Sequence, residues 1–523
     1  MKRYVAVLMV MVGIVCYAQE PLLKGWTPMR AGDVDINKCM VSENGKITLK
    51  CFLEGLGNFF STTPTEAVAG NNVVFTFTAS VKGKVSCGFH RYPDKGWILA
   101  GAMTVKQIEE SETPREYKIT IPVEGNDVRF IRPLFSLGKD ASITISQYSF
   151  AVTGEKSKNI SVDAKLDQVS AKYKTGEVAV FTLKVIQGEE PVKDGTATVT
   201  LLKNNLPQWS KTLDLSKTNP IVLNETSEVP GFVGIQMEVS KEGASKYSSM
   251  PLVAAFDPEK IKTGKEAPKD LLSYWNGEYE KLKKEVPPNY KREPAGEAGG
   301  FKRYTITADN FDGTKIYAGL TVPNGNGTFP LVLTVPPAGN WGYGFFRFPN
   351  AICLTITVFD RLFPTDKDYK EFNSPVWYFK RNATARDKYY YYKAILGVMR
   401  MMEYAQTLPE WDKMNIVASG RSQGGGFAFI MAGLNPEIQA LSADVPALCD
   451  HNATDAGRQP GWPQLLNAEP GFKDNSPYFD AANFAAYVKC PAIVSVGFID
   501  TMCVPSSVYA AFNNLKGEKK IYD

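Results

Sequence analysis

A serine set in a run of glycines, between two apolar stretches, is the feature that most constrains this chain. Residues 420–426 read Gly-Arg-Ser-Gln-Gly-Gly-Gly; the stretch 414–419 is typical of a short buried strand, and 425–432 of the start of a helix. A strand, a sharp turn and a helix in that order lift a serine hydroxyl above a sheet, at a helix N-terminus. The pentapeptide alone occurs by chance, so an ordinary Ser-Gly turn is the alternative. From this context we predict an α/β-hydrolase domain with Ser422 as its nucleophile.

A carboxylate follows where such a nucleophile needs one. In this fold the triad runs Ser, then Asp or Glu, then His along the chain. Residues 491–500 form an apolar run that ends at Asp500, which we expect at the carboxyl end of a central parallel strand. We predict Asp500 as the catalytic acid. The alternative is a loop Asp that caps the helix announced by Pro505.

Two backbone N–H groups should bind the charge that develops on the ester oxygen. One belongs to Gln423, the residue after the nucleophile. The other is expected in the loop after the apolar strand 330–335, where two prolines have no N–H, which leaves Ala338 or Gly339. A plain tight turn is the alternative for this loop.

The base is harder to assign, because the chain has two histidines, His90 and His451, and neither follows Asp500. His451 comes after the apolar stretch 441–448, so a role as substitute base stays open beside the simpler prediction of a surface-loop histidine. His90 lies in a β-rich region, where we expect a structural role. The simplest account is a truncated record of a longer enzyme, C-terminally incomplete, and the chain as given would then be inactive.

Several separate motifs between Pro268 and Asp523 match one known family. They are Pro-Lys-Asp at 268–270 with Tyr-Trp at 274–275, Asp-Gly at 312–313 with Tyr-Ala-Gly at 317–319, Asp-Lys-Tyr-Tyr-Tyr at 387–391, the glycine-rich segment at 420–426, and Gly-Phe-Ile-Asp at 497–500 with Pro-Ser-Ser at 505–507. Together they resemble the acetyl xylan esterase and cephalosporin C deacetylase group, the family 7 carbohydrate esterases. The match covers nearly half of the chain.

The resemblance implies deacetylation of short acetylated sugars or xylo-oligosaccharides by a Ser-His-Asp triad, with no metal or other cofactor. It carries Ser422 and Asp500 over as nucleophile and acid, and Ala338 and Gln423 as oxyanion donors. The family usually has His-Gly-Tyr where this chain has Pro-Pro-Ala at 336–338, so the first donor departs from the pattern. The family histidine lies in a Gly-His segment after the last strand, and residues 519–523 resemble the start of that strand.

The N-terminal half is predicted to hold two all-β sandwich domains. Alternating short strands over 20–155 favour a sandwich that loosely resembles carbohydrate-binding jelly rolls. Its candidates for stacking on sugars are Trp26, Phe89, Tyr92 and Trp97, with packing in the core as the alternative.

A second run of strands, over 156–256, has the length and spacing of an immunoglobulin-like domain, which we interpret as a spacer. The charged segment 257–269, interrupted by Gly264 and Pro268, is expected to be the linker into the α/β-hydrolase domain, which takes up 257–523.

Charge and composition bound the partners and the compartment. The net charge is +4, with acids and bases interspersed, which gives no basis for binding nucleic acid or anionic membranes. Residues 1–18 have the pattern of a signal peptide, too short to span a bilayer, so we expect a secreted or periplasmic protein. Cys39 and Cys51 are a plausible disulfide. With two histidines and no close cysteine pairs, a structural zinc site is not expected.

Taken together, the sequence predicts a secreted carbohydrate esterase that acts on acetylated oligo- or polysaccharides through an acyl-enzyme. One alternative is a broader carboxylesterase or peptidase of the same fold. The other is a non-catalytic glycan-binding protein with a triad-deficient hydrolase domain. A homo-oligomer is among the expectations, since multimers are common in the resembled family.

Overall fold

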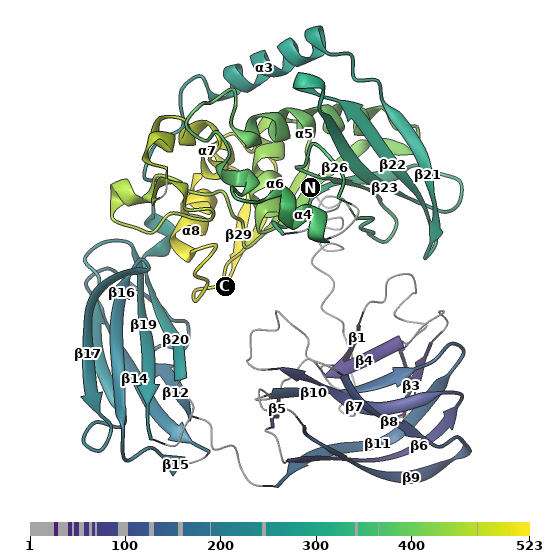
Figure 1. Cartoon of the computed structure of the whole chain (residues 1–523), viewed down its shortest axis with the longest axis vertical. Helices are drawn as coiled ribbons and strands as arrows, with labels where there is room; N and C mark the ends of the chain where they lie inside the picture. The colour runs from purple at the N-terminus through teal and green to yellow at the C-terminus, as the bar shows by residue number, and fades with distance from the viewer. Residues whose placement is uncertain are drawn as a thin grey trace.

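The computed structural model describes most of the chain after residue 26. The described ranges are 26–29, 40–43, 46–51, 57–61, 65–67, 71–92, 103–124, 130–154, 160–188, 190–242, 247–339, 344–363, 366–467 and 469–523. Within these ranges the strands form two pairs of sheets, followed by one large mixed sheet with helices (Figure 1).

The first pair of sheets encloses a core of its own. One sheet has the order β1 (Trp26–Met29), β4 (Gly57–Ser61), β10 (Phe130–Leu137), β7 (Val85–Tyr92), β8 (Met103–Ile108), with β5 (Thr65–Glu66) paired to β10. The other has the order β2 (Met40–Glu43), β3 (Lys46–Lys50), β11 (Ser142–Thr153), β6 (Asn72–Lys82), β9 (Ser111–Pro122). Along β6, buried residues alternate with half-exposed ones, the period-2 pattern of a strand with one face on a core.

Several sequence-based expectations fall on this first pair of sheets. Phe89 is 0% exposed and belongs to the core between the sheets, so its assignment as a sugar-stacking residue is wrong: its ring has no face open to a ligand. Trp97, the side chains of Trp26 and Tyr92, and Cys39 of the expected disulfide lie outside the described residues.

The second pair of sheets has the same construction. One sheet contains β12 (Ile160–Leu166), β14 (Val178–Gln187) and β15 (Glu190–Pro191), with β18 (Ile221–Thr226) on the other edge of β14. The facing sheet has the order β13 (Lys172–Tyr173), β20 (Tyr247–Phe256), β19 (Gly231–Ser240), β16 (Thr196–Lys203), β17 (Leu206–Asp214). Residues from both sheets share one cluster of buried apolar side chains.

The remaining described strands form one nine-stranded sheet. Its order is β21 (Lys291–Ala298), β22 (Phe301–Asp309), β23 (Lys315–Pro323), β25 (Ile352–Ile356), β24 (Phe329–Val335), β26 (Trp411–Arg421), β27 (Ala440–Asp444), β28 (Ala492–Ser495), β29 (Lys519–Tyr522). The first three strands pair antiparallel, and neighbours from β25 to β29 pair parallel. This part of the chain has the fold of an α/β hydrolase, as predicted.

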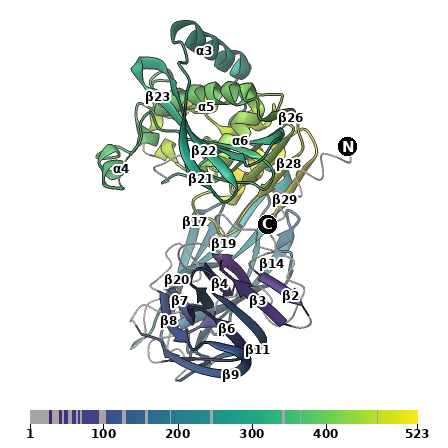
Figure 2. The same ribbon diagram turned by 90° about the vertical axis from the view of Figure 1, so that its right-hand side faces the viewer.

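The helices gather in one layer against a single face of this sheet (Figures 1 and 2), and their buried side chains share one core with the strand residues that point to that face. These helices are α3 (Leu271–Glu285), α4 (Asp366–Phe372), α5 (Tyr390–Thr407), α6 (Gln423–Leu434), α7 (Ala481–Ala485) and α8 (Pro505–Asn514). Short 3-10 turns are η2 (Pro258–Lys260), η3 (Phe311–Gly313), η4 (Tyr378–Lys380), η5 (Ala453–Ala456), η6 (Leu465–Asn467), η7 (Pro470–Asp474) and η8 (Ser476–Tyr478). Strands β24 and β25 are buried on both faces, which explains their unbroken apolar sequences.

The segment expected to be a linker is held by hydrogen bonds at its start. The Asp257 carboxylate is 1% exposed; its Oδ2 accepts hydrogen bonds from the Thr175 N–H at 3.2 Å and from the Lys260 ammonium at 3.0 Å. The Asn513 amide, on α8, donates to the carbonyls of Pro258 at 2.9 Å and Ile261 at 2.8 Å. Residues 257–261 are therefore fixed to both the second pair of sheets and the hydrolase.

Residues 262–264 of the same segment are also held by hydrogen bonds. Asp450, which is fully buried, accepts from the Gly264 N–H at 2.6 Å. The Arg458 guanidinium bonds to the Asp450 carboxylate at 2.8 Å and to the Lys262 carbonyl at 2.6 Å. A Cβ on Gly264 would lie 1.9 Å from the Asn452 carbonyl oxygen, so the backbone passes too closely for any other residue.

The second pair of sheets packs directly on the hydrolase beside Asp500. Phe232, on β19, is 2% exposed, and its ring centroid lies 5.3 Å from that of Phe498 and 5.7 Å from that of Tyr509. The Asn204 carbonyl accepts from the Gln459 N–H at 3.1 Å. Residues 156–256 are therefore more than a spacer, since they supply part of the hydrolase core.

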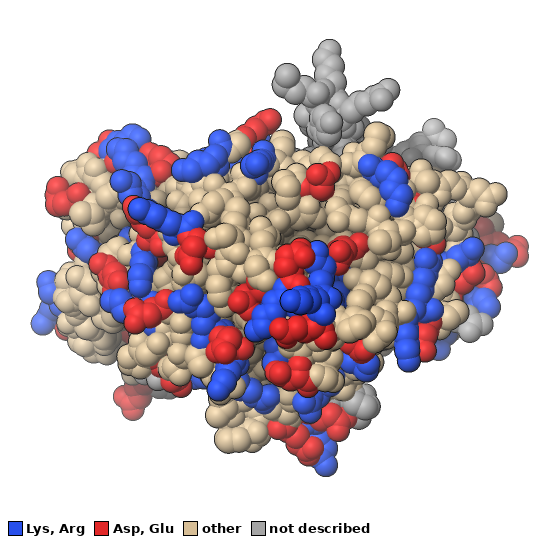
Figure 3. Space-filling model, turned by 90° about the horizontal axis from the view of Figure 1, so that it is seen from above, with Lys and Arg blue, Asp and Glu red and all other residues tan. Residues whose placement is uncertain are grey.

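Two features of the structure concern nucleic acid and membranes as partners: the charge pattern on the surface and the apolar character of the helices. Figure 3 shows basic and acidic side chains intermixed over the face seen from above, without a field of one sign. Within the described ranges, no helix combines the length and the apolar character needed to cross a bilayer.

Phe232→Ala should destabilise the hydrolase as well as the second pair of sheets. Removing a buried phenylalanine ring costs about 3–5 kcal/mol, and here the lost contacts lie on both sides of the junction. The control is Val222→Ala, a 53% exposed position on β18, which should change the free energy of unfolding by less than about 0.5 kcal/mol. Urea unfolding followed by fluorescence measures both. A Phe232→Ala transition that leaves the hydrolase midpoint unchanged would contradict the shared core.

Candidate active site

Ser422 lies at the sharp turn between β26 and α6. Its backbone has φ 54° and ψ −120°, a strained conformation for a residue with a side chain. The surrounding backbone holds it there: the Ser422 N–H donates to the Asp444 carbonyl at 2.9 Å, and the Ser422 carbonyl accepts from Gly426 at 3.1 Å and Ala447 at 2.9 Å. The predicted strand, turn and helix are all present, and the serine sits at the N-terminus of the helix.

Close backbone contacts explain the glycines around Ser422. A Cβ on Gly420 would lie 2.4 Å from the carbonyl carbon of Gly424, and a Cβ on Gly424 would lie 2.0 Å from the Val335 carbonyl oxygen. Neither distance leaves space for a methyl group. The glycine spacing read from the sequence is therefore a packing requirement between β24, β26 and the first turn of α6.

The side chain of Gln423 ties this turn to its surroundings. It is 2% exposed. Its Oε1 accepts hydrogen bonds from the hydroxyls of Tyr378 at 2.6 Å and Tyr391 at 2.7 Å, and its Nε2 donates to the Pro336 carbonyl at 3.2 Å. One amide thus links the serine turn, the loop after β24 and two buried tyrosines. The sequence analysis assigned only the backbone of Gln423 a role.

Burial keeps these tyrosines protonated. It raises the pKa of both Tyr378 and Tyr391 well above the usual value, because a phenolate would lose its hydration in the core. Both hydroxyls therefore act as donors toward the Gln423 oxygen over the whole accessible pH range. This fixes the orientation of the amide, with its NH₂ group toward Pro336.

The two predicted oxyanion donors lie on two segments that the Gln423 side chain connects. As the first residue of α6, Gln423 has a backbone N–H without a partner inside the helix. Ala338 lies in the turn directly after β24, two residues beyond the Pro336 carbonyl that the Gln423 amide holds. The Gln423 side chain therefore fixes the loop that contains Ala338, while the Gln423 backbone N–H is the other predicted donor.

Asp500 lies in a turn after β28, not at the strand end as predicted. The strand ends at Ser495, and the chain continues through a tight turn to Asp500. The Asp500 Oδ1 accepts from the N–H groups of Met502 at 2.8 Å and Cys503 at 2.9 Å. Within the described residues, no hydrogen bond to the other carboxylate oxygen, Oδ2, is present. β28 is also next to the edge strand β29 and is not central to the sheet.

Cys503 connects the acid turn to the serine. Its Sγ lies 3.8 Å from the Ser422 Oγ. Burial, with the charge of Asp500 nearby, raises the pKa of the Cys503 thiol to about 12, so the group is a neutral thiol. Within the described part of the chain, the Ser422 hydroxyl contacts this thiol and no histidine. The sequence predicted Ser422 and Asp500 as members of one site. In the structure Cys503 contacts both, through its Sγ to the Ser422 hydroxyl and through its N–H to the Asp500 carboxylate.

His451 is not on the surface, so that prediction is wrong. The side chain is 2% exposed, and its ring packs 5.6 Å from that of Phe472, centroid to centroid. Burial lowers its pKa to about 4, which keeps the imidazole neutral. His90, in β7, is buried as well, which fits the structural role expected of it.

Two buried carboxylates hold the backbone around His451. Asp480 accepts from the N–H groups of Asp450 at 2.8 Å and His451 at 2.7 Å. Burial raises the pKa of Asp480 to about 7 and that of Asp450 to about 6, the latter against the lowering effect of Arg458. These hydrogen bonds explain how a polar stretch of sequence, 450–452, lies inside the protein.

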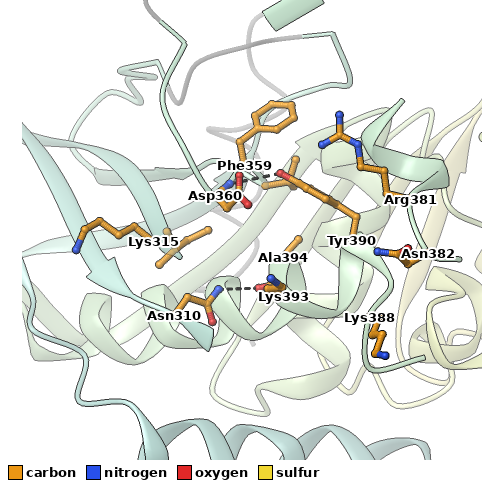
Figure 4. Close-up of a pocket in the computed structure, with 12 residues that line it drawn as sticks. Asn310, Lys315, Phe359, Asp360, Arg381, Asn382, Lys388, Tyr390, Lys393 and Ala394 are labelled. Carbon is orange, nitrogen blue, oxygen red and sulfur yellow. Dashed lines mark hydrogen bonds between the residues drawn. The ribbon is translucent and has the colours of Figure 1, made fainter. Parts of the chain in front are cut away.

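A pocket elsewhere on the same domain is not the site of these residues. Figure 4 shows it between the starts of β23 and α5, lined by residues that include Lys315, Asp360, Tyr390 and Lys393. None of the predicted site residues lines it. Two of its cations are paired with carboxylates, because Lys315 bonds to Asp309 and Lys393 lies 2.9 Å from Asp312. In the described part of the chain, no cluster of three or more His, Cys, Asp or Glu could hold a metal ion.

The parallel sheet, the strained serine turn and the covering helices define an α/β hydrolase. A family model described as acetyl xylan esterase (AXE1) matches residues 255–458 and 468–523. This part of the chain belongs to the acetyl xylan esterase family, and the protein is a carbohydrate ester hydrolase.

Individual relatives carry related names. The chain is 28% identical over 312 residues to acetyl esterase Axe7A of Xylanibacter ruminicola, covering 56% of this chain and 70% of that protein. The acetyl xylan esterase from Paenibacillus sp. R4 aligns with a TM-score of 0.43 at 21% identity, over 51% of this chain and 90% of its own. Acetyl xylan esterase 1 from Thermoanaerobacterium sp. JW/SL YS485 aligns with a TM-score of 0.43 at 21% identity, over 52% and 91%.

Replacing Gln423 by Leu should destabilise the domain by about 2–5 kcal/mol, because two buried hydroxyls lose their acceptor. Adding Tyr378→Phe and Tyr391→Phe to that variant should recover part of the loss, since no hydroxyl is then left unpaired. Gln208→Leu, at an exposed glutamine on β17, is the control and should be close to neutral. Chemical unfolding measures all of these; a triple variant less stable than Gln423→Leu would contradict the hydrogen-bond assignment.

The stability of the protein should depend on pH through His451. A pKa lowered from 6.5 to about 4 contributes stability above pH 6.5 that is lost as the pH falls through 4, by up to about 3 kcal/mol. His451→Phe should lack this loss. The raised pKa of Asp480 acts in the opposite direction over pH 4–7, but it is present in both proteins. Unfolding free energies at several pH values test this, and parallel curves for the two proteins would refute it.

Proposed function

We propose that the protein removes acetyl groups from acetylated xylan or xylo-oligosaccharides through an acyl-enzyme on Ser422. The observation that carries the proposal is the strained backbone of Ser422 at the start of α6. Membership of the acetyl xylan esterase family supports acetyl as the acyl group and xylan as the sugar. The name of the Xylanibacter ruminicola relative, an acetyl esterase, agrees.

In this mechanism the Ser422 oxygen attacks the carbonyl carbon of the acetyl ester while a base takes the hydroxyl proton. The negative charge on the carbonyl oxygen is bound by the N–H groups of Gln423 and Ala338. The bond to the sugar oxygen then breaks, and that oxygen leaves with a proton. Water attacks the acetyl-serine in the same way and releases acetate. Asp500 is proposed as the acid that orients the base.

Two alternatives remain as outcomes of the test. A broader carboxylesterase or peptidase would use the same serine turn with a different leaving group. A glycan-binding protein would bind the same sugar without using the Ser422 hydroxyl, which lies 3.8 Å from the Cys503 thiol.

The remaining domain assignments are also proposals. We infer that residues 20–155 and 156–256 are β-sandwich domains, the first jelly-roll-like and the second immunoglobulin-like. Each pair of sheets encloses a common buried core, which supports this. We further propose that residues 1–18, which lie outside the described ranges, are a signal peptide and that the protein is exported, on the pattern of their sequence.

Ser422→Ala should lower kcat/KM for acetate release from acetylated xylo-oligosaccharides by at least about 10³-fold, as expected when an activated serine is lost. The matched control is Ser273→Ala, on α3, whose hydroxyl donates to a backbone carbonyl of its own helix cap and should leave the rate unchanged. Acetate release by the unaltered chain, with equal rates for Ser422→Ala, would refute the acyl-enzyme. Binding of xylo-oligosaccharide without acetate release would favour the glycan-binding alternative, and cleavage of unrelated esters or peptides at comparable rates the broader hydrolase.

A further inference from the structure

Three aromatic side chains lie in a row beside the serine turn. We call Trp377, Phe379 and Trp462 the aromatic strip. Trp377 is 44% exposed, and the other two are half-buried. The rings of Trp377 and Phe379 are nearly parallel, with centroids 5.8 Å apart and planes at 22°; those of Phe379 and Trp462 are 4.8 Å apart at 62°. Neighbouring rings thus touch along the whole strip.

One end of the strip is anchored to the residue after the nucleophile. Tyr378 lies between the first two strip residues in sequence and points into the core, where its hydroxyl donates to Gln423 at 2.6 Å. Trp377, just before this 3-10 turn, is exposed, and the half-buried Phe379 ring packs against the Tyr378 ring with centroids 5.3 Å apart. Gln423 therefore fixes the position of the strip as well as the position of the oxyanion loop.

The other end is anchored to the acid turn and to the serine backbone. The Trp462 N–H donates to the Met502 carbonyl at 3.1 Å, and its own carbonyl accepts from Leu448 at 2.8 Å. Leu448 follows Ala447, whose N–H donates to the Ser422 carbonyl at 2.9 Å. The strip thus runs from the Gln423 side of Ser422 to the Asp500 side, and a ligand lying on it is presented to the serine.

The chemistry of the strip favours a neutral, flat ligand. Residues 373–379 read Asn-Ser-Pro-Val-Trp-Tyr-Phe and carry no charge, which gives no attraction for a charged ligand. Aromatic faces are electron-rich and pack well against C–H groups, which line the two faces of a pyranose ring. Next to Trp462, the amides of Gln459 and Gln464 lie near the Thr501 carbonyl, at 3.4 and 3.5 Å, and can also bond to sugar hydroxyls.

Packing alone explains Phe379 and Trp462, which rest against the hydrolase core, but it does not explain Trp377. The Trp377 ring meets the core residue Tyr369 with centroids 6.2 Å apart, yet it leaves 44% of its surface in water. The exposed neighbours Val376, at 45%, and Met502, at 56%, extend the apolar surface on both sides. An exposed apolar surface at the edge of a candidate active site is typical of a binding site.

We propose that the aromatic strip binds the pyranose rings of the oligosaccharide chain by stacking and so sets the preference for sugar esters over small esters. This rests on the proposed function, because it names the part of the enzyme that holds the sugar backbone of the same substrate. The acetyl group is bound at Ser422, and the strip recognises the unacetylated part of the chain.

The first test is binding, which does not depend on turnover. Unacetylated xylo-oligosaccharides of four to six sugars are titrated into the full chain, with calorimetry as the readout. Trp377→Ala and Trp462→Ala should each weaken binding about tenfold, the loss expected of one stacking face. The matched control is Trp209→Ala, a tryptophan of β17 in the second pair of sheets, which should bind as the unaltered protein does. Equal affinity of Trp377→Ala and the unaltered chain overturns the proposal.

The second test is discrimination between esters. The ratio of kcat/KM for acetylated xylo-oligosaccharide to kcat/KM for p-nitrophenyl acetate should fall about tenfold in Trp377→Ala, through KM for the oligosaccharide, and should be unchanged in Trp209→Ala. The ratio separates a lost sugar contact from a general loss of activity. An unchanged ratio in Trp377→Ala overturns the proposal even if both rates fall.

The two tests also separate this proposal from the proposed function. Oligosaccharide binding that weakens in Trp377→Ala, without acetate release by any variant, supports the strip and refutes the esterase. Acetate release with unaltered oligosaccharide binding in Trp377→Ala supports the esterase and refutes the strip. Sedimentation of the same variants covers one further occupant: if Trp377→Ala converts an oligomer to a monomer without weakening sugar binding, the strip is a contact between copies of the chain, and the proposal is wrong.

Discussion

The close approach of β24 to the first turn of α6 is the constraint on which the rest of the site depends. Because Gly424 touches the Val335 carbonyl, the serine turn and the loop after β24 have a fixed separation. The Gln423 amide then spans that separation and holds the loop by its Pro336 carbonyl. The oxyanion loop and, through Tyr378, one end of the aromatic strip are attached to this one contact.

The serine turn could be predicted from sequence because the forces that shape it are local. Glycines two residues either side of Ser422, an apolar strand before it and a helix after it are all read from about twenty consecutive residues. The contacts that orient the site are not local. The Gln423 amide meets hydroxyls 32 and 45 residues away, and no spacing rule links a glutamine to tyrosines at such distances. A run of four tyrosines at 389–392 was visible in the sequence, but not which of them faces the serine turn.

Errors arose where polar or aromatic residues were judged by type alone. The stretch Asp450-His451-Asn452 is polar, which predicts a surface loop, yet all three residues are buried. Asp480 accepts from the N–H groups of Asp450 and His451, Arg458 pairs with the Asp450 carboxylate, and the Asn452 amide donates to Ser476. Phe89 was weighed as a ligand-stacking residue, but β7 is buried on both faces. Asp500 was placed at a strand end, whereas four residues, 496–499, separate it from β28; an apolar run does not mark where its strand ends.

Segment 257–264 is held by hydrogen bonds to the second pair of sheets and to the hydrolase, and Phe232 packs against Phe498 and Tyr509. The second pair of sheets and the hydrolase would therefore have to be exchanged together. A chimera that joined a foreign module at residue 257 would discard the partner of the Asp257 carboxylate and bare two aromatic rings beside the acid turn. A recombination point ahead of residue 160 would keep both intact.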